Sequence, residues 1–157
     1  MNIVLQRDVG AIGAILALSA ASAATAAGAG DATTVTGRTI DRFALGNGSM
    51  PQDFNPAVVY EATLASGATI RIGYAIQDSA DGSTWADYQT ATYSAALQTG
   101  PSGGGAVFGT FDIGSVSLTS ARRYIRVNYN PDLSAGGTDT AVARAIGFFA
   151  GFDRLPS

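Results

Sequence analysis

Apolar and polar residues alternate along most of the chain after residue 31, which is the pattern of half-buried β-strands. In the clearest run, residues 69–77, one face carries isoleucine and tyrosine and the other carries polar or small residues. Residues 57–65 alternate in the same way, with Val58, Tyr60, Ala62 and Leu64 on one face. Further strands are predicted at 32–43, 85–93, 106–113, 122–130 and 140–152.

Turn-forming residues separate these runs. Gly, Asn, Ser, Asp and Pro gather at 46–51, 66–67, 78–83, 98–105 and 131–137. No window after residue 31 has a helical period with capping residues. About seven short strands at regular spacing predict an all-β, single-domain antiparallel β-sandwich or jelly roll over residues 32–157.

Residues 1–31 have a different composition and are predicted to form an N-terminal Ala/Gly-rich arm. An uncharged run from Val9 to Gly30 begins with large apolar residues and continues into Ala, Ser, Thr and Gly. One interpretation is a cleaved secretory signal, with small residues near Ala24. Asp8, at the start of the apolar run, is atypical of a signal, and the large apolar residues end at Leu18, too early for a membrane helix.

The other interpretation is an arm, extended or helical, that lies on a partner subunit. Deleting residues 1–30 would then leave a folded domain that binds its partner poorly. The partner interface would be formed by the apolar residues of this arm and by two adjacent arginines. These residues are Ile3, Val4, Leu5, Val9, Ile12, Ile15, Leu16, Leu18, Arg122 and Arg123.

The composition excludes several kinds of chemistry. All nine basic residues of the 157-residue chain are Arg, and there is no Lys, His or Cys. Disulfides, thiolate or imidazole metal sites and Ser-His-Asp, Cys-His or Ser-Lys catalysis therefore cannot form. The net charge of −3 argues against nucleic acid as a partner. Charged residues make up 13 %, against about 25 % in typical domains, which predicts that much of the surface contacts another protein.

The aspartate-rich turn at 78–83 is the strongest candidate for a metal site. An EF-hand register with Gly82 at the sixth position fails, because Gln77 and Tyr88 fall where carboxylates are needed. A looser calcium site could use Asp78, Asp81 and Asp87, but a turn capped by its own aspartates is favoured. We predict no metal and no cofactor.

Acid–base catalysis also lacks a signal. A pair of carboxylates for glycoside hydrolysis could come from Glu61, Asp78, Asp81, Asp87 and Asp112, but no spacing singles out two of them. The sequence therefore predicts that the protein is not an enzyme. Trp85, the single Trp, is expected in the core, with a ligand-stacking platform as the alternative.

Several stretches together resemble a known class of proteins. They are Ile76 to Asp87, the Ala-Arg-Arg-Tyr-Ile-Arg-Val run at 121–127, and the segments 36–42, 133–140 and 151–156. In these stretches the chain resembles the decoration, or cement, proteins of tailed bacteriophages, across most of residues 34–156. The resemblance implies a structural virion protein that binds the outside of an assembled capsid and bridges capsomers. It also implies the major capsid protein as partner and a homo-oligomer, dimer or trimer, on the virion surface.

The same stretches are similar to a second class. The turn Ser-x-Asp-Gly-x-x-Trp at 79–85 and the later Arg-Tyr-Ile-Arg strand also resemble discoidin-like carbohydrate-binding jelly rolls. That resemblance implies a secreted module with a cleaved signal peptide, with Trp85 and Asp81 as the ligand platform. The two hypotheses differ most at the N-terminus, where an ordered, uncleaved arm favours the capsid protein.

Overall fold

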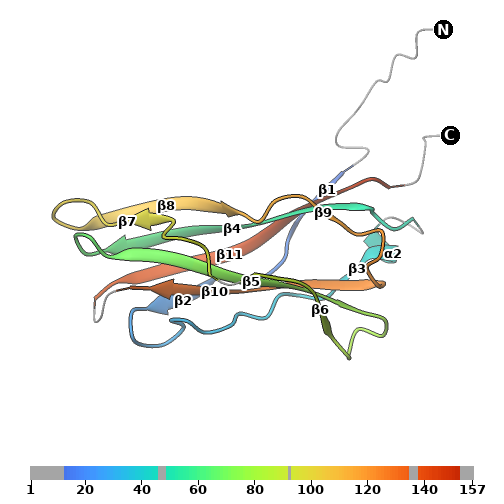
Figure 1. The fold of residues 1–157 in the computed structure, drawn as a ribbon, viewed down its shortest axis with the longest axis horizontal. Helices are drawn as coiled ribbons and strands as arrows, with labels where there is room; N and C mark the ends of the chain where they lie inside the picture. The colour runs from blue at the N-terminus through green and yellow to red at the C-terminus, as the bar shows by residue number, and fades with distance from the viewer. Residues whose placement is uncertain (1–12, 46–48, 92, 135–137, 153–157) are drawn as a thin grey trace, which may run out of the picture.

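The computed structural model describes residues 13–45, 49–91, 93–134 and 138–152, and the regular secondary structure within them is almost entirely β-strand. Two antiparallel sheets run along the long axis of the molecule, as Figure 1 shows. The predicted all-β sandwich is therefore confirmed. No helix in the described ranges is long and apolar enough to span a membrane.

The first sheet has six strands in the order β1-β11-β4-β8, with β2 beside β11 and β9 beside β4. Its strands are β1 (Ala14–Ala17), β2 (Ser22–Thr25), β4 (Asp53–Leu64), β8 (Gly105–Asp112), β9 (Val116–Ser117) and β11 (Thr140–Ala150). The second sheet has five strands in the order β3-β10-β5-β6, with β7 beside β5. Its strands are β3 (Ile40–Asp41), β5 (Thr69–Ser79), β6 (Ala86–Ala91), β7 (Gln98–Thr99) and β10 (Tyr124–Leu133). A single helical turn, α2 (Arg42–Leu45), follows β3.

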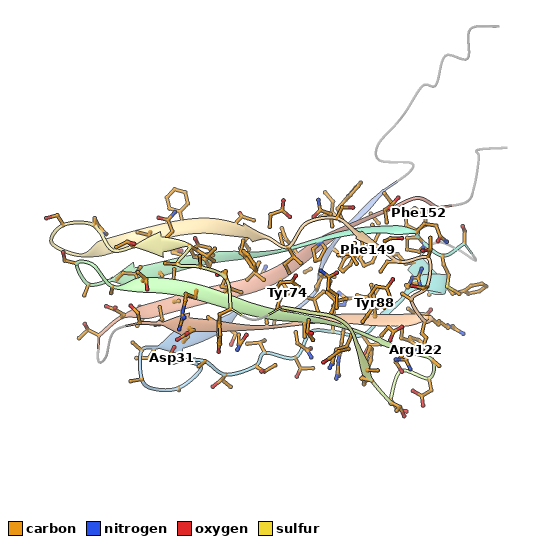
Figure 2. The ribbon with its side chains drawn as sticks, in the orientation of Figure 1. Asp31, Tyr74, Tyr88, Arg122, Phe149 and Phe152 are labelled. Carbon is orange, nitrogen blue, oxygen red and sulfur yellow. The ribbon has the colours of Figure 1, made fainter. Side chains whose placement is uncertain are left out.

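The core lies between the sheets and uses the faces that alternation predicted. The even positions of β4 from 54 to 64 are buried, and so are Ile125, Val127 and Tyr129 of β10. Phe149, labelled in Figure 2, stacks on Phe54 of the neighbouring strand with ring centroids 4.3 Å apart. Apolar burial at roughly 25 cal/mol per Å² is therefore the main stabilising term of the sandwich.

The first sheet extends into the range that the sequence assigned to the arm. Both β1 and β2 pair with β11, so that residues 14–17 and 22–25 complete the edge of the sheet. The amide of Leu18 donates to Ala145 O at 2.8 Å, and its side chain is 1 % exposed. Backbone hydrogen bonds to β11 hold β1 and β2 in place, since their small side chains bury little apolar area. Residues 14–17 and 22–25 are therefore extended and not helical.

Asp31 fixes the crossing from the first sheet to the second. Its carboxylate accepts hydrogen bonds from the backbone N–H groups of Ala27 and Leu133, at 2.7 and 2.8 Å. Figure 2 labels this residue in the loop that follows β2. The predicted boundary between residues 31 and 32 thus falls inside a loop that is tied to β10.

Other predicted boundaries also differ from the structure. Residues 131–133, expected in a loop, continue β10 and pair with residues 70–72 of β5. The strand expected at 32–43 is divided into an extended segment with one bridge at Val35, then β3 and α2. Gly37 allows the close approach, because a Cβ there would lie 2.1 Å from the carbonyl oxygen of Val127.

A buried arginine holds this divided region in place. Arg42 is 2 % exposed, and its guanidinium donates four hydrogen bonds to backbone carbonyls at 2.6–3.0 Å. The acceptors lie in two segments that are distant from each other in sequence, at Pro51 and at 118–122. Burial lowers the pKa of Arg42, and nearby Tyr88 and Asp78 partly offset that effect.

Candidate contact surface

The outer face of the six-stranded sheet carries the most exposed large apolar side chains in the described residues. Phe108 of β8 is 82 % exposed, Ile15 of β1 is 77 % exposed and Val142 of β11 is 49 % exposed. Strand alternation places these residues on the side opposite the core. Soluble monomers rarely keep large apolar patches in water, so this face is a candidate contact surface. We call it the apolar face.

Two shallow grooves mark the apolar face. The larger, about 600 Å³, runs between β8, β4 and β11 and is lined by Phe108, Val59, Val142 and the charged pair Glu61 and Arg144, among others. The smaller, about 300 Å³, lies nearer β1 and is lined by apolar residues that include Ile15, Ile146 and Phe148.

The larger groove contains one charge of each sign. Glu61 lies opposite Val142 across the β4–β11 pair, and Arg144 lies opposite Val59. Neither side chain forms an ion pair with another described residue. A partner surface with complementary charges could therefore fix the register of a contact here.

The predicted arm residues have different positions in the structure. Ile15 belongs to the apolar face, and Leu16 is half-buried and packs against the core. The prediction that Leu18 contacts a partner is wrong, because its side chain packs against β11 inside the sandwich and is buried. The remaining arm residues, Ile3, Val4, Leu5, Val9 and Ile12, lie outside the described residues.

The two adjacent arginines bind carboxylates of their own chain. Arg122 donates to Asp78 at 2.5 and 2.9 Å, and Arg123 donates to Asp41 at 2.6 and 3.0 Å. Burial raises the pKa of Asp78, but its hydrogen bonds with Arg122 outweigh this and the pKa is lowered overall. The Arg122–Asp78 pair connects the loop before β10 to β5, and the Arg123–Asp41 pair connects the same loop to β3. A partner would therefore compete with internal ion pairs for these two arginines.

The aspartate-rich turn is built around Asp81. Its carboxylate accepts the backbone N–H groups of Ser83 and Thr84 at 2.9 and 2.8 Å and the hydroxyl of Ser79 at 2.9 Å. These backbone hydrogen bonds lower the pKa of Asp81. The carboxylate of Asp81 is thus used by the turn itself, and that of Asp78 is bound by Arg122. No metal-binding cluster occurs among the residues described.

Trp85 is half-buried at the start of β6 and does not join the core cluster. The guanidinium carbon of Arg126 lies 4.2 Å from the centre of its ring, a cation–π contact that covers one face of the indole. The core position expected from the sequence is therefore wrong. The cause is the polar loop before β6, which places the ring over β10 on the outer side of the second sheet.

The sequence signalled neither Phe108 nor Val142 as a contact residue. In the strand predicted at 106–113, Val107 and Phe111 pack against the core, so Phe108 was one apolar residue among several. The sequence does contain one indication, because the strand predicted at 106–113 has large apolar residues on both faces. In a sheet with one face in water, the outer face of a strand is usually polar.

Comparisons with known proteins place the chain near no named family. No family model matches the chain, and no curated protein matches it either. Among solved structures, the infectious bursal disease virus Gx strain matches with a TM-score of 0.46 and 12 % identity, over 90 % of this chain and 33 % of that one. The VP2 subviral particle of the same virus matches with a TM-score of 0.43 and 10 % identity, over 88 % and 32 %. The chain thus spans about a third of those chains, and no functional inference follows at this level of similarity.

Proposed function

We propose that the protein is a structural virion protein that binds the outside of an assembled phage capsid through the apolar face and bridges capsomers. The observation that carries the proposal is this face itself, with Phe108 and Ile15 more than three-quarters exposed. The sequence resemblance to decoration proteins supports the same role. In this role the protein has no catalytic residues and no cofactor.

The proposed mechanism is mass action on assembly. A protein that binds only the assembled shell stabilises the shell by its own binding free energy. Burying one exposed Phe or Ile side chain contributes about 1.5–3 kcal/mol. The apolar side chains of the face cost little to remove from water, whereas Glu61 and Arg144 would need partner groups of complementary charge. The major capsid protein is the proposed partner, and a dimer or trimer would multiply the contacts.

Residues 1–12 keep their proposed role as an arm. They contain Ile3, Val4, Leu5, Val9 and Ile12, and they precede β1 at the edge of the apolar face. Deleting residues 1–12 is expected to weaken capsid binding and to leave the thermal unfolding temperature of the sandwich close to that of the full chain. Equal capsid retention by the two forms would end the arm hypothesis.

The apolar face is tested by co-sedimentation with purified capsids. Phe108→Ser is expected to reduce capsid affinity about tenfold or more, because the lost burial is worth at least about 1.5 kcal/mol. Phe43→Ser is the matched control, since Phe43 is also exposed (46 %) but belongs to α2. Thermal unfolding of both variants checks that the fold is intact. If Phe108→Ser sediments with capsids as fully as Phe43→Ser does, the apolar face is not the contact surface.

A further inference from the structure

The outer side of the five-stranded sheet has a cleft of about 430 Å³ whose chemistry is opposite to that of the apolar face. Its lining is polar and aromatic, with amide, carboxylate, hydroxyl and phenol groups from four segments of the chain. The side chains that matter are Thr34, Gln77, Asp87, Tyr93, Asn128 and Asn130. The volume falls within the range of small-molecule sites.

The cleft exists because β5 has two small residues in the middle of its outer face. Gly73 and Ala75 form the floor, between the long side chains of Arg71 and Gln77 on the same face. A Cβ at position 73 would lie 2.2 Å from Oδ1 of Asn130, so the glycine lets the Asn130 amide lie directly over the strand. Neighbouring strands therefore hold long polar side chains around a floor that does not fill the space between them.

Hydrogen bonds hold the polar side chains in place. The amide of Asn128 donates to Gln77 Oε1 at 2.9 Å, and the amide of Gln77 donates to Asp87 Oδ1 at 2.7 Å. At the other end, the amide of Asn130 donates to the Tyr93 hydroxyl at 2.5 Å. Side chains fixed before a ligand arrives lose little conformational entropy on binding.

The cleft keeps hydrogen-bonding capacity for a ligand. Asp87 Oδ2, Asn130 Oδ1 and the Thr34 hydroxyl have no hydrogen-bond partner among the described residues. Each amide nitrogen has a second N–H beyond the one already used. Acceptors and donors thus alternate around a floor without charge.

Among the described residues that line the cleft, Asp87 is the one charged side chain, and no arginine lines it. Arg71 forms an ion pair with Asp132, while Arg126 donates to Gln77 and covers Trp85. A phosphate or sulfate would need an unpaired cation, and a cationic ligand would need more than the single carboxylate of Asp87. A neutral molecule with several hydroxyl groups matches the donors and acceptors that remain.

We propose that this cleft binds a neutral saccharide of one or two sugar units. Hydroxyl pairs would donate to Asp87 and Asn130 and accept from the amides, beside the Tyr93 ring, over which the Arg71 guanidinium carbon lies 5.3 Å from the ring centre. The site differs from the one that the discoidin-like resemblance implies, because neither Trp85 nor Asp81 lines the cleft. It goes beyond capsid binding, since it lies on the sheet opposite the apolar face.

The test is saturation-transfer NMR on the full-length protein with maltose, cellobiose, lactose and mannobiose, with a sulfated heparin disaccharide as the anionic comparison. Ala75→Val fills the floor, and Asp87→Ala removes the main acceptor. Asp87→Ala is expected to lower affinity about tenfold or more, the loss typical of hydrogen bonds to a charged group. Ala75→Val is expected to lower affinity by a similar factor, because the added methyl groups occupy the space of the ligand. Ala106→Val is the matched control, because it makes the same change at an exposed strand position outside the cleft.

Saturable binding of a neutral disaccharide that is lost in Ala75→Val and Asp87→Ala, but kept in Ala106→Val, supports the proposal. Three results overturn it: no saturable signal with any neutral disaccharide, binding of the sulfated disaccharide alone, or equal binding by the cleft variants and the control. Thermal unfolding of every variant separates loss of binding from loss of fold. Capsid co-sedimentation of Ala75→Val and Asp87→Ala is expected to be unchanged, because both positions lie on the five-stranded sheet, so the two proposals fail independently.

Discussion

Leu18→Ala tests whether the N-terminal segment is a structural part of the sandwich. The side chain is 1 % exposed, belongs to the core cluster and packs against β11, where a Cβ on Gly147 would lie 2.8 Å from Leu18 Cδ1. Leucine-to-alanine changes at such sites cost about 2–5 kcal/mol, because apolar burial is lost and a cavity remains. We expect the free energy of unfolding to fall by about 3 kcal/mol, and the thermal midpoint by about 6–12 °C for a chain of this size.

Ile15→Ala is the matched comparison. Ile15 lies three positions earlier in the same segment but is 77 % exposed, so its removal is expected to change stability by no more than about 0.5 kcal/mol. Urea unfolding followed by far-ultraviolet circular dichroism gives both free energies. Fluorescence of the single Trp gives an independent measure of the same transition.

Equal urea midpoints for Leu18→Ala and Ile15→Ala would refute this reasoning. Residues 13–26 would then not be packed on β11, and the arm expected from the sequence, which lies on a partner subunit and is free of its own sandwich, would be correct. The deletion of residues 1–30 distinguishes the same alternatives. It removes β1, β2 and the buried residues Leu18, Ala24 and Ala26, so we expect it to destabilise the domain, whereas a free arm predicts an unchanged midpoint.

Three further predictions concern polar and backbone features. Asp78→Asn is expected to destabilise the protein at neutral pH; because the folded-state pKa of Asp78 is lowered, its stabilisation is present above the ordinary value of 3.8 and is lost as the pH falls below it. Urea midpoints across acid pH check this, and a pH-independent difference from the wild type would contradict it. Arg42→Met should cost about 3 kcal/mol or more in thermal unfolding, since four carbonyls lose their donor, and Arg42→Lys should not restore it. Gly37→Ala should cost about 1–3 kcal/mol, because its Cβ would collide with a backbone oxygen of Val127; an unchanged melting temperature would show that the segment beside β10 can move.

The main strands could be predicted because apolar and polar residues alternate in them in the same order as buried and exposed positions. In β5, Ile70, Ile72 and Ile76 are fully buried, while Arg71 points to solvent. When one face of a strand is buried, a shift of one residue would expose every apolar side chain, so the sequence specifies the register strongly. The sandwich follows from several such strands of similar length.

The edge strands β1 and β2 could not be predicted for the converse reason. In β2 the residues are Ser, Ala, Ala and Thr, and only Ala24 is buried. Small side chains show almost no contrast between buried and exposed faces, while the backbone hydrogen bonds that hold β2 to β11 do not depend on side-chain type. Composition alone suggested an arm, and only the tertiary pairing shows a strand.

The candidate sites escaped prediction because each depends on side chains from several strands. The cleft requires Gly73 and Ala75 to lie beside Asn130 and Asn128, a juxtaposition that the β5–β10 register creates and that no local motif reveals. Trp85 is a candidate by residue type alone. Its environment depends on Arg126, about forty residues away in sequence, whose guanidinium covers one face of the ring.

The low charge of the chain has a different meaning on the two sides of the sandwich. On the five-stranded side, ion pairs such as Arg71–Asp132 and Arg122–Asp78 neutralise one another, which leaves amides and hydroxyls to determine what binds. On the six-stranded side, exposed apolar groups such as Phe108 lie beside the charged side chains of Glu61 and Arg144. If the apolar face is docked on a capsid, the polar cleft on the opposite sheet is directed away from the shell. Loss of capsid binding in Phe108→Ser should therefore leave saccharide binding intact, because the side chains of the two sites are separated by the core.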